Sequence, residues 1–461
     1  MCMKTESIWN KYSEKQLEEL ESLSADYRKF LDQGKTEREC VSQIVNRIED
    51  EGYVELEKIL KDGKKIKSGD KVYAVNMDKS VVMYHIGKAP MEEGMNILGA
   101  HIDSPRMDVK QNPLYEDGDF AYLDTHYYGG IKKYQWVALP LALHGVIVKK
   151  DGTTAIVNIG EEEDDPVFFI SDLLIHLAAE QMDKKATKVI EGEALDVIVG
   201  NKPLKGTEKD AFCAGILKIL KEQYDVEEKD FISAEIEVVP AGRAREAGFD
   251  RSMTLAYGQD DRVCAFTSLD AMWSIETPER TACCLLVDKE EIGSVGATGM
   301  QSRFFENMTA EVMELLGEFK ELSLRRCLAN SRMLSSDVSS AFDPTYASSF
   351  DKKNVAYLGH GMVFNKFTGS RGKSGSNDAN AEYLAFIRKV MDDAEVSFQT
   401  AELGKVDLGG GGTIAYILSL YGMNVIDCGV AVLNMHAPFE ATSKADLYEA
   451  KRGYVAFLLA K

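Results

Sequence analysis

The sequence predicts an α/β protein in which a mixed, mostly parallel sheet carries helices on both faces. Three observations predict it. Beyond residue 250, short apolar runs alternate with stretches of helical periodicity. Residues 5–60 are also helical in pattern, whereas residues 108–250 are rich in turn residues and β-like runs. We therefore expect one discontinuous domain, 1–107 and 251–461, with a β-rich domain inserted at 108–250.

The N-terminal part begins with helices and then turns to strands. Thr36-Glu37-Arg38-Glu39 has the pattern of a capping box, which favours a helix starting there. Strands are expected around 72–75, 81–86 and 95–100, and the last of these ends directly at His101. In the insert we expect short strands such as 145–148 and 154–158, together with a single helix over 171–182.

The alternation after residue 250 gives the remaining elements. We expect strands at 262–266, 282–287, 333–336, 355–364, 396–400 and 425–433. We expect helices near 268–277, 302–316, 377–392 and 412–420.

Composition excludes several classes of protein. The chain has 54 basic and 75 acidic residues, and its net charge of −21 argues against nucleic acid or an anionic membrane as partner. No apolar run approaches the length of a membrane span, and the N-terminus lacks the apolar core of a signal peptide. The eight cysteines form no C-x-x-C pair, as expected of reduced thiols. We therefore expect a cytoplasmic protein.

Polar side chains follow several of the predicted strands. The set consists of His101, Asp103, Asp270, Glu290, Glu291, Asp337 and His436. Imidazole and carboxylate groups at one sheet edge are a ligand set for two divalent ions, which activate a water between them. A carboxylate that binds no metal is then needed to take the proton.

Four residues of this set also have a simpler interpretation. Glu290-Glu291, after the apolar run 281–287, is also typical of a solvated loop. His101 is equally consistent with an interior histidine, and Asp270 with a helix cap. Residues 101 and 103 of an extended strand point to one side, so Asp103 is expected to accept a hydrogen bond from His101.

Five motifs occur in a fixed order along the chain. They are Gly99-Ala-His101-Ile-Asp103-Ser-Pro-Arg106, Ser268-Leu-Asp270, Asp288-Lys-Glu290-Glu291-Ile-Gly-Ser294, Ser335-Ser-Asp337 and Asn434-Met-His436. Together they resemble the aspartyl aminopeptidase family of di-zinc metallopeptidases. The resemblance implies that His101, Asp270 and Asp337 bind one metal, that Asp270, Glu291 and His436 bind the other, and that Glu290 is the general base. It also implies a cis peptide bond after Asp270.

The resemblance extends to assembly and substrate. It implies dimers built through the insert, assembled into a tetrahedral dodecamer, with His176 delivered to a neighbouring subunit's site. Lys366 is a candidate for attracting an acidic substrate side chain, with Arg371 and Lys373 as competitors and a plain surface lysine as the alternative interpretation. His360 would line the pocket, and the glycine run 409–412, including Gly411, would let the peptide backbone approach.

The sequence thus predicts a cytoplasmic metalloaminopeptidase with two divalent ions per subunit, Zn²⁺ or alternatively Co²⁺ or Mn²⁺. Its partners would be peptides and further copies of itself, with a preference for acidic N-terminal residues. Two alternatives stay open. One is another di-metal amide hydrolase, such as a deacylase or carboxypeptidase. The other is a non-catalytic assembly protein of the same fold.

Overall fold

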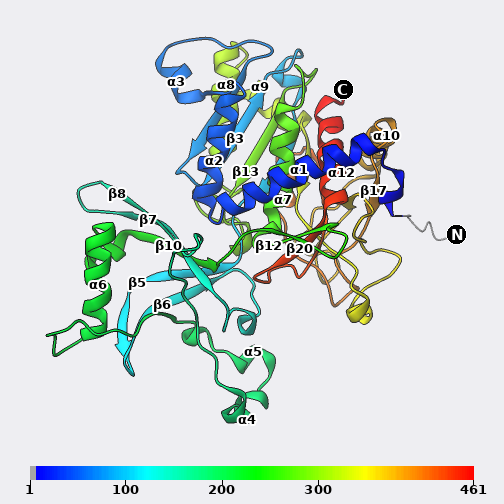
Figure 1. Ribbon diagram of the computed structural model, residues 1–461. Helices are drawn as coiled ribbons and strands as arrows, with labels where there is room; N and C mark the ends of the chain where they lie inside the picture. Colours follow the sequence, from blue (N-terminus) through cyan, green and yellow to red (C-terminus); the bar gives the residue numbers. More distant parts are fainter. Residues whose placement is uncertain (1–6) are drawn as a thin grey trace. The chain divides into compact units, whose positions relative to one another are not determined.

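The computed structural model describes residues 7–461, so Cys2 and the start of the predicted N-terminal helical region lie outside the described residues (Figure 1). The chain divides into two compact units. The first comprises the residues up to Asp103 together with Ala244–Met435 and Glu440–Lys461, and the second comprises Ser104–Arg243 and His436–Phe439.

A nine-stranded sheet forms the centre of the first unit. In spatial order its strands are β1 (Val54–Glu55), β2 (Lys71–Asn76), β3 (Ser80–His85), β13 (Ala282–Val287), β4 (Asn96–His101), β14 (Arg332–Ser336), β18 (Asn424–Gly429), β16 (Met362–Asn365) and β17 (Phe398–Thr400). The four central strands β13, β4, β14 and β18 are parallel to one another. Their carboxyl ends therefore lie at one edge of the sheet.

Helices cover both faces of this sheet. On one face lie α1 (Glu14–Gln33), α2 (Glu37–Asp50), α7 (Gln259–Trp273), α10 (Ala381–Asp393) and α12 (Lys444–Leu459). On the other lie α3 (Leu56–Lys61), α8 (Phe304–Leu316), α9 (Glu321–Asn330) and α11 (Ala415–Ser419). Buried residues of β13 alternate between the two cores: Cys284 and Leu286 face the first, Cys283 and Leu285 the second. Figure 1 shows α1, α7 and α12 side by side. The predicted α/β class is confirmed.

A five-stranded sheet completes the first unit. Its order is β11 (Arg245–Ala247), β12 (Met253–Ala256), β20 (Glu440–Ser443), β19 (Ala431–Leu433) and β15 (Ser339–Ser340).

The predicted capping box at the start of α2 is present, because Thr36 Oγ1 accepts the Glu39 N–H at 3.2 Å and Glu39 Oε2 accepts the Thr36 N–H at 3.1 Å.

The second unit is built on an antiparallel six-stranded sheet. Its order is β8 (Thr154–Ile159), β7 (Leu141–Val148), β10 (Ala234–Pro240), β5 (Arg106–Asp117), β6 (Phe120–Tyr128) and β9 (Val197–Gly200). Its helices are α4 (Ala179–Met182), α5 (Ala186–Val189) and α6 (Ala211–Tyr224). The predicted helix over 171–182 is wrong. Those residues form a 3₁₀ turn at Ile175–Leu177 followed by the short α4.

The largest error in the predicted elements concerns residues 262–266, which were expected to be a strand. They lie inside α7, where 13 of the 15 residues are buried. A helix that is buried on almost every side has no polar face, so its apolar run has no helical period and is easily read as a buried strand. This error matters for the site, because it moved the expected strand end to Asp270.

Candidate metal centre

The carboxyl edge of the nine-stranded sheet gathers several of the predicted residues. His101 is the last residue of β4, and Asp337 directly follows β14. Glu290 and Glu291 begin a single 3₁₀ turn, Glu290–Ile292, just beyond β13. Because these three strands are adjacent and parallel, the polar residues that follow them lie at the same edge.

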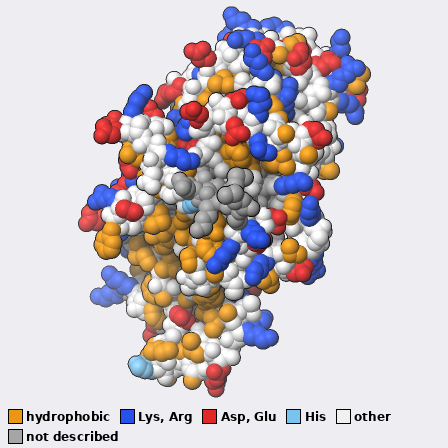
Figure 2. Space-filling model, turned by 90° about the vertical axis from the view of Figure 1, so that its right-hand side faces the viewer, with side chains coloured by type: hydrophobic (Ala, Val, Ile, Leu, Met, Phe, Trp, Pro, Cys, Tyr) orange, Lys and Arg blue, Asp and Glu red, His pale blue; other side chains and the backbone are white. Residues whose placement is uncertain are grey.

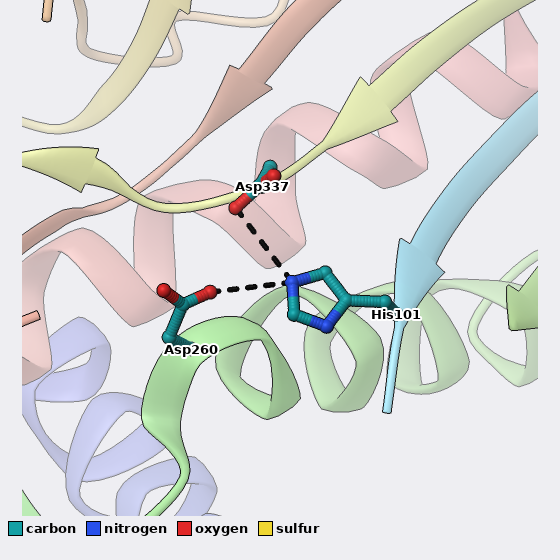
Figure 3. Close-up of side chains that lie close together, drawn as sticks. All are labelled: His101, Asp260 and Asp337. Atoms are coloured by element: carbon teal, nitrogen blue, oxygen red, sulfur yellow. Dashed lines mark ion pairs between the residues drawn. The ribbon is translucent and has the colours of Figure 1, made fainter. Parts of the chain in front are cut away.

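The His101 ring lies between two sets of carboxylate oxygens. Its Nε2 is 3.3 Å from Asp260 Oδ1 and 3.9 Å from Asp337 Oδ1 (Figure 3). Its Nδ1 is 3.1 Å from the Asp103 carbonyl oxygen and 3.3 Å from Asp103 Oδ1. Oxygen atoms on the Nδ1 side accept its hydrogen, which leaves the lone pair of Nε2 directed towards Asp260 and Asp337. This is the orientation of a metal-binding histidine.

Asp103 also holds the turn that follows β13. Its Oδ1 accepts the Glu290 N–H and its Oδ2 accepts the Glu291 N–H, both at 3.2 Å. One fully buried carboxylate therefore orients both the histidine and the two adjacent glutamates. The expected proximity of Asp103 to the His101 ring is found, and the contact to the turn was not foreseen.

The structure corrects the expectation for Asp270. Asp270 lies in the last turn of α7, where its Oδ2 pairs with Lys451 Nζ at 2.5 Å. Asp260, near the start of the same helix, is the aspartate that lies beside His101 and Asp337. The cis peptide bond is likewise Asp260-Asp261 and not Asp270-Ala271. The sequence signal for this position is Gly258-Gln259 followed by two adjacent acids, Asp260 and Asp261.

Asp260 is also close to the glutamate turn, since Asp260 and Glu291 offer carboxylate oxygens within 4.8 Å of each other. His101, Asp260 and Asp337 form a group with the same spacing. Asp260 therefore belongs to two groups of side chains that could hold a metal ion.

The electrostatics of this group favour a bound cation. Burial raises the pKa of Asp337 well above its ordinary value, and the charge of Asp260 raises it further. Burial lowers the pKa of His101, but hydrogen bonds to Asp103 and Asp260 outweigh burial, and the net shift is well upwards. Without a cation the group holds protons to offset its own charge. One nitrogen and several buried carboxylate oxygens are donors that suit zinc.

Comparison with known proteins identifies the family. The model of the aminopeptidase I zinc metalloprotease family (M18) matches residues 30–458. A probable M18 family aminopeptidase 1 from Clostridium acetobutylicum is 61% identical over 453 residues, covering 98% of this chain and 97% of that protein. The chain belongs to the M18 family. It is a zinc aminopeptidase, a peptide hydrolase, and the resemblance to aspartyl aminopeptidases is confirmed.

Solved structures of M18 aminopeptidases share its fold. An M18 aminopeptidase from Thermotoga maritima superposes with a TM-score of 0.95 at 44% identity and covers all of both chains. Aminopeptidase I from Clostridium acetobutylicum gives a TM-score of 0.93 at 59% identity, covering 99% of this chain and 100% of that one.

Two predicted histidines of this M18 protein lie in the second unit. The Nδ1 of His436 is 2.9 Å from the Gly130 carbonyl oxygen, which accepts its hydrogen. His176 lies in the 3₁₀ turn Ile175–Leu177 and its side chain is exposed.

The predicted substrate-binding residues lie on loops of the first unit. Lys366 Nζ is 3.9 Å and Lys373 Nζ 2.9 Å from carboxylate oxygens of Asp378, so both lysines face the same acid. The Gly411 N–H donates to the Thr368 carbonyl at 3.0 Å, which joins the glycine run to the lysine loop. His360 packs against Tyr357 at 5.5 Å between ring centroids.

Proposed function

We propose that this zinc aminopeptidase binds two divalent ions. His101, Asp260 and Asp337 would hold the first ion. Asp260 and Glu291 would hold the second with Asp260 as the bridge, and the resemblance implies His436 as its further ligand. The observation that carries this proposal is that Asp260 belongs to two groups that could hold a metal ion, in a chain of a zinc metalloprotease family. Zn²⁺ is the expected ion, with Co²⁺ or Mn²⁺ as alternatives.

Glu290 is the residue we assign as general base. When bound, the zinc ions would polarise the scissile carbonyl and lower the pKa of a water molecule. Glu290 would take the proton from that water and deliver it to the leaving amine. Its position is supported by Asp103, whose carboxylate accepts the Glu290 N–H and so fixes its backbone.

The substrate would be the N-terminal residue of a peptide, with a preference for acidic side chains. A cavity of ≈ 300 Å³ lies between loops 367–373 and 402–409, and Arg371, Lys373 and Lys405 line it. Lys366 lies at the start of the first loop and remains our first choice for recognising an acid, with Arg371 and Lys373 as competitors. Gly411 follows the second loop, where it would let the peptide backbone approach.

We further propose a cytoplasmic homo-oligomer built through the second unit. In this unit Leu174, Ile175 and Leu177 are 54–69% exposed, and an apolar run of this kind is typical of an interface. The lowest part of Figure 2, which corresponds to α4 and α5 in Figure 1, displays hydrophobic side chains. His176 lies within this run and would reach a neighbouring subunit's site. None of the described helices is long and apolar enough to cross a membrane.

Dimers assembled into a dodecamer are the proposed final state. A Saccharomyces cerevisiae structure described as an mApe1 dodecamer has a TM-score of 0.77 with this chain, but at 19% identity it establishes likeness of fold alone. Light scattering of the purified protein would distinguish a dimer from a dodecamer.

The experiment that tests the function is a hydrolysis panel. Aminoacyl substrates with Asp, Glu, Leu or Ala at the N-terminus would be assayed beside their N-acetylated forms, together with elemental analysis of the protein. We expect activity on free N-termini only, and about two zinc ions per chain. Cleavage of the acetylated forms would favour a deacylase or carboxypeptidase, and inactivity on every substrate would favour a non-catalytic assembly protein.

The general base has its own test in Glu290→Gln. General acid–base catalysis contributes about 10²–10⁴-fold to rate, so turnover should fall by that factor. Zinc content should not change, because Glu290 is not one of the proposed ligands. Wild-type turnover by this variant would refute the assigned role.

A further inference from the structure

The turn that carries Glu290 and Glu291 is fastened at its base by a second buried aspartate. Asp288 directly follows β13 and is 1% exposed. Its Oδ1 accepts the Lys289 N–H at 2.7 Å, and its Oδ2 accepts the Thr298 hydroxyl at 2.6 Å. Lys289 Nζ also donates to Oδ2 at 3.0 Å. We call Asp288, Lys289 and Thr298 the Asp288 clasp.

The clasp closes the ends of the segment that contains the glutamates. The Asp288 N–H donates to the Thr298 carbonyl at 3.3 Å, so backbone and side chain join the same two residues. Inside the segment, the Ser294 N–H donates to the Lys289 carbonyl at 2.6 Å. Glu290 and Glu291 therefore lie on a small closed loop whose entry residue, Lys289, is fixed through its backbone N–H, its carbonyl and its side chain.

Gly296 leaves room for the lysine. A Cβ built on Gly296 would lie 3.2 Å from Lys289 Cε and 3.3 Å from Cδ, closer than nearly all real contacts of this kind. Its φ of +115° is also a conformation that favours glycine. The lysine stem therefore folds back across Gly296 to reach Asp288. Glycine at position 296 therefore gives both the backbone conformation and the space that the clasp requires.

We propose that the Asp288 clasp is a positioning device for the Glu290 carboxylate. This inference rests on the proposed role of Glu290 as general base. Asp103 holds the Glu290 and Glu291 N–H groups, whereas the clasp holds Lys289 and Thr298. The clasp supplies the second point of attachment. Displacing a catalytic group by about 1 Å lowers the rate by about 10²-fold. Loosening this attachment should therefore lower kcat.

The test is Thr298→Val, which removes the hydroxyl and keeps the shape of the side chain. We expect kcat to fall about tenfold, an intermediate loss for a partial shift of the base. KM should stay near the wild-type value, and zinc content should not change. Thr298→Ser restores the hydroxyl and should restore kcat. If the hydroxyl had only a structural role, Thr298→Val would lower the melting temperature, but kcat would not fall while KM and zinc content stay constant.

Thr309→Val is the matched control. Thr309 is buried in α8, where its hydroxyl lies 2.9 Å from the Tyr84 hydroxyl and 2.8 Å from the Phe305 carbonyl. This variant should lose comparable stability and keep its kcat. Lys289→Met gives a second measurement, because its partly exposed side chain tolerates the change while the Nζ contact is lost. We expect a smaller fall in kcat for it.

Two different failures are distinguishable. The clasp has no positioning role if kcat in Thr298→Val and Lys289→Met is as high as in the control Thr309→Val. The same holds if the loss of activity in these variants is explained by lost zinc or by a raised KM alone. In either case the enzyme still acts as proposed. If the wild-type protein hydrolyses no aminoacyl substrate, or if Glu290→Gln keeps full turnover, the proposed function fails and the clasp proposal fails with it.

Discussion

Two regions of the first unit supply candidate metal ligands, and they hold their side chains in different ways. His101 ends a strand that is paired on both sides, and the Asp337 N–H donates to the Cys428 carbonyl of the adjacent strand at 2.7 Å. Asp260 instead lies where the start of α7 is not helical, with ψ at 106°. Its N–H donates to the side chain of Glu440 at 3.0 Å.

The chain next to Asp260 is fixed by hydrogen bonds of the Gln259 and Arg262 side chains. Gln259 accepts hydrogen bonds from Thr442 and Tyr27, and its amide donates to two backbone carbonyls. Arg262 donates to the carbonyls of Ile102 and Lys35 at 3.1 and 2.9 Å. The strands hold the backbone at His101 and Asp337 through main-chain hydrogen bonds that any residue makes, while the Asp103 carboxylate orients the His101 ring. The start of α7 positions its ligand through particular side chains, so we expect it to be the more sensitive to substitution.

The largest expected effect comes from Asp260→Asn compared with Asp270→Asn. Losing the shared ligand should remove about 4 kcal/mol or more of transition-state stabilisation, which is about a 10³-fold loss of kcat/KM. Asp270→Asn removes only the ion pair with Lys451 and should stay close to wild type. Kinetics and elemental analysis of both variants measure the difference. Comparable losses in the two would mean that Asp260 is not the bridge.

The contrast between these two regions also explains what the sequence revealed. The strand-end residues were predictable because an apolar run followed by a polar residue marks the end of a buried strand, as at Val287 and Ser336. Glu290 and Glu291 were found in this way. Asp260 precedes the apolar run of a buried helix, so the same rule pointed past it to Asp270. The polar neighbours that hold Asp260, such as Glu440, are distant in sequence and no local pattern joins them.

The next largest effect is expected from Gln259→Met, which leaves the hydrogen-bonding partners of Gln259 buried and unpaired. Changes to groups that orient a ligand cost about 10–100-fold in metal affinity, and we expect the dissociation constant for zinc to rise by this factor. The control is Ser331→Ala at the opposite end of the sheet. Ser331 Oγ accepts the Met95 N–H and donates to the Cys327 carbonyl.

Both variants should be less stable than the wild type, because each loses buried hydrogen bonds worth about 1 kcal/mol apiece. Only Gln259→Met should bind zinc more weakly in a competition assay with a chelator. An unchanged zinc affinity in Gln259→Met would show that the start of α7 is as firmly held as the sheet edge.

The smallest effect on activity is expected at Asp427, a strand-borne carboxyl that lies beside the centre without belonging to either ligand group. Residue 427 pairs with Ser335 of β14, and its Oδ1 accepts the Thr413 hydroxyl at 2.5 Å. Burial raises the pKa of Asp427 to about 7, although the hydrogen bond from Thr413 opposes the shift. We expect Asp427→Asn to keep near wild-type turnover, because the neutral amide resembles the protonated acid.

The signature of Asp427 should appear in stability instead. Between about pH 4 and 7 the folded protein keeps the proton on Asp427 while the unfolded chain has lost it, so the free energy of unfolding falls as pH rises through that window. Each pKa unit is 1.36 kcal/mol, so this group contributes a fall of about 4 kcal/mol at most. Urea unfolding across this pH window should show a shallower fall in the free energy of unfolding for Asp427→Asn.

Asp351→Asn is the control. A hydrogen bond from the Lys353 N–H lowers the pKa of this exposed carboxyl, so its shift is opposite in direction to that of Asp427. Equal slopes in wild type and Asp427→Asn would mean that Asp427 is ionised in the folded protein, and its carboxylate would then belong with the charged groups of the metal centre.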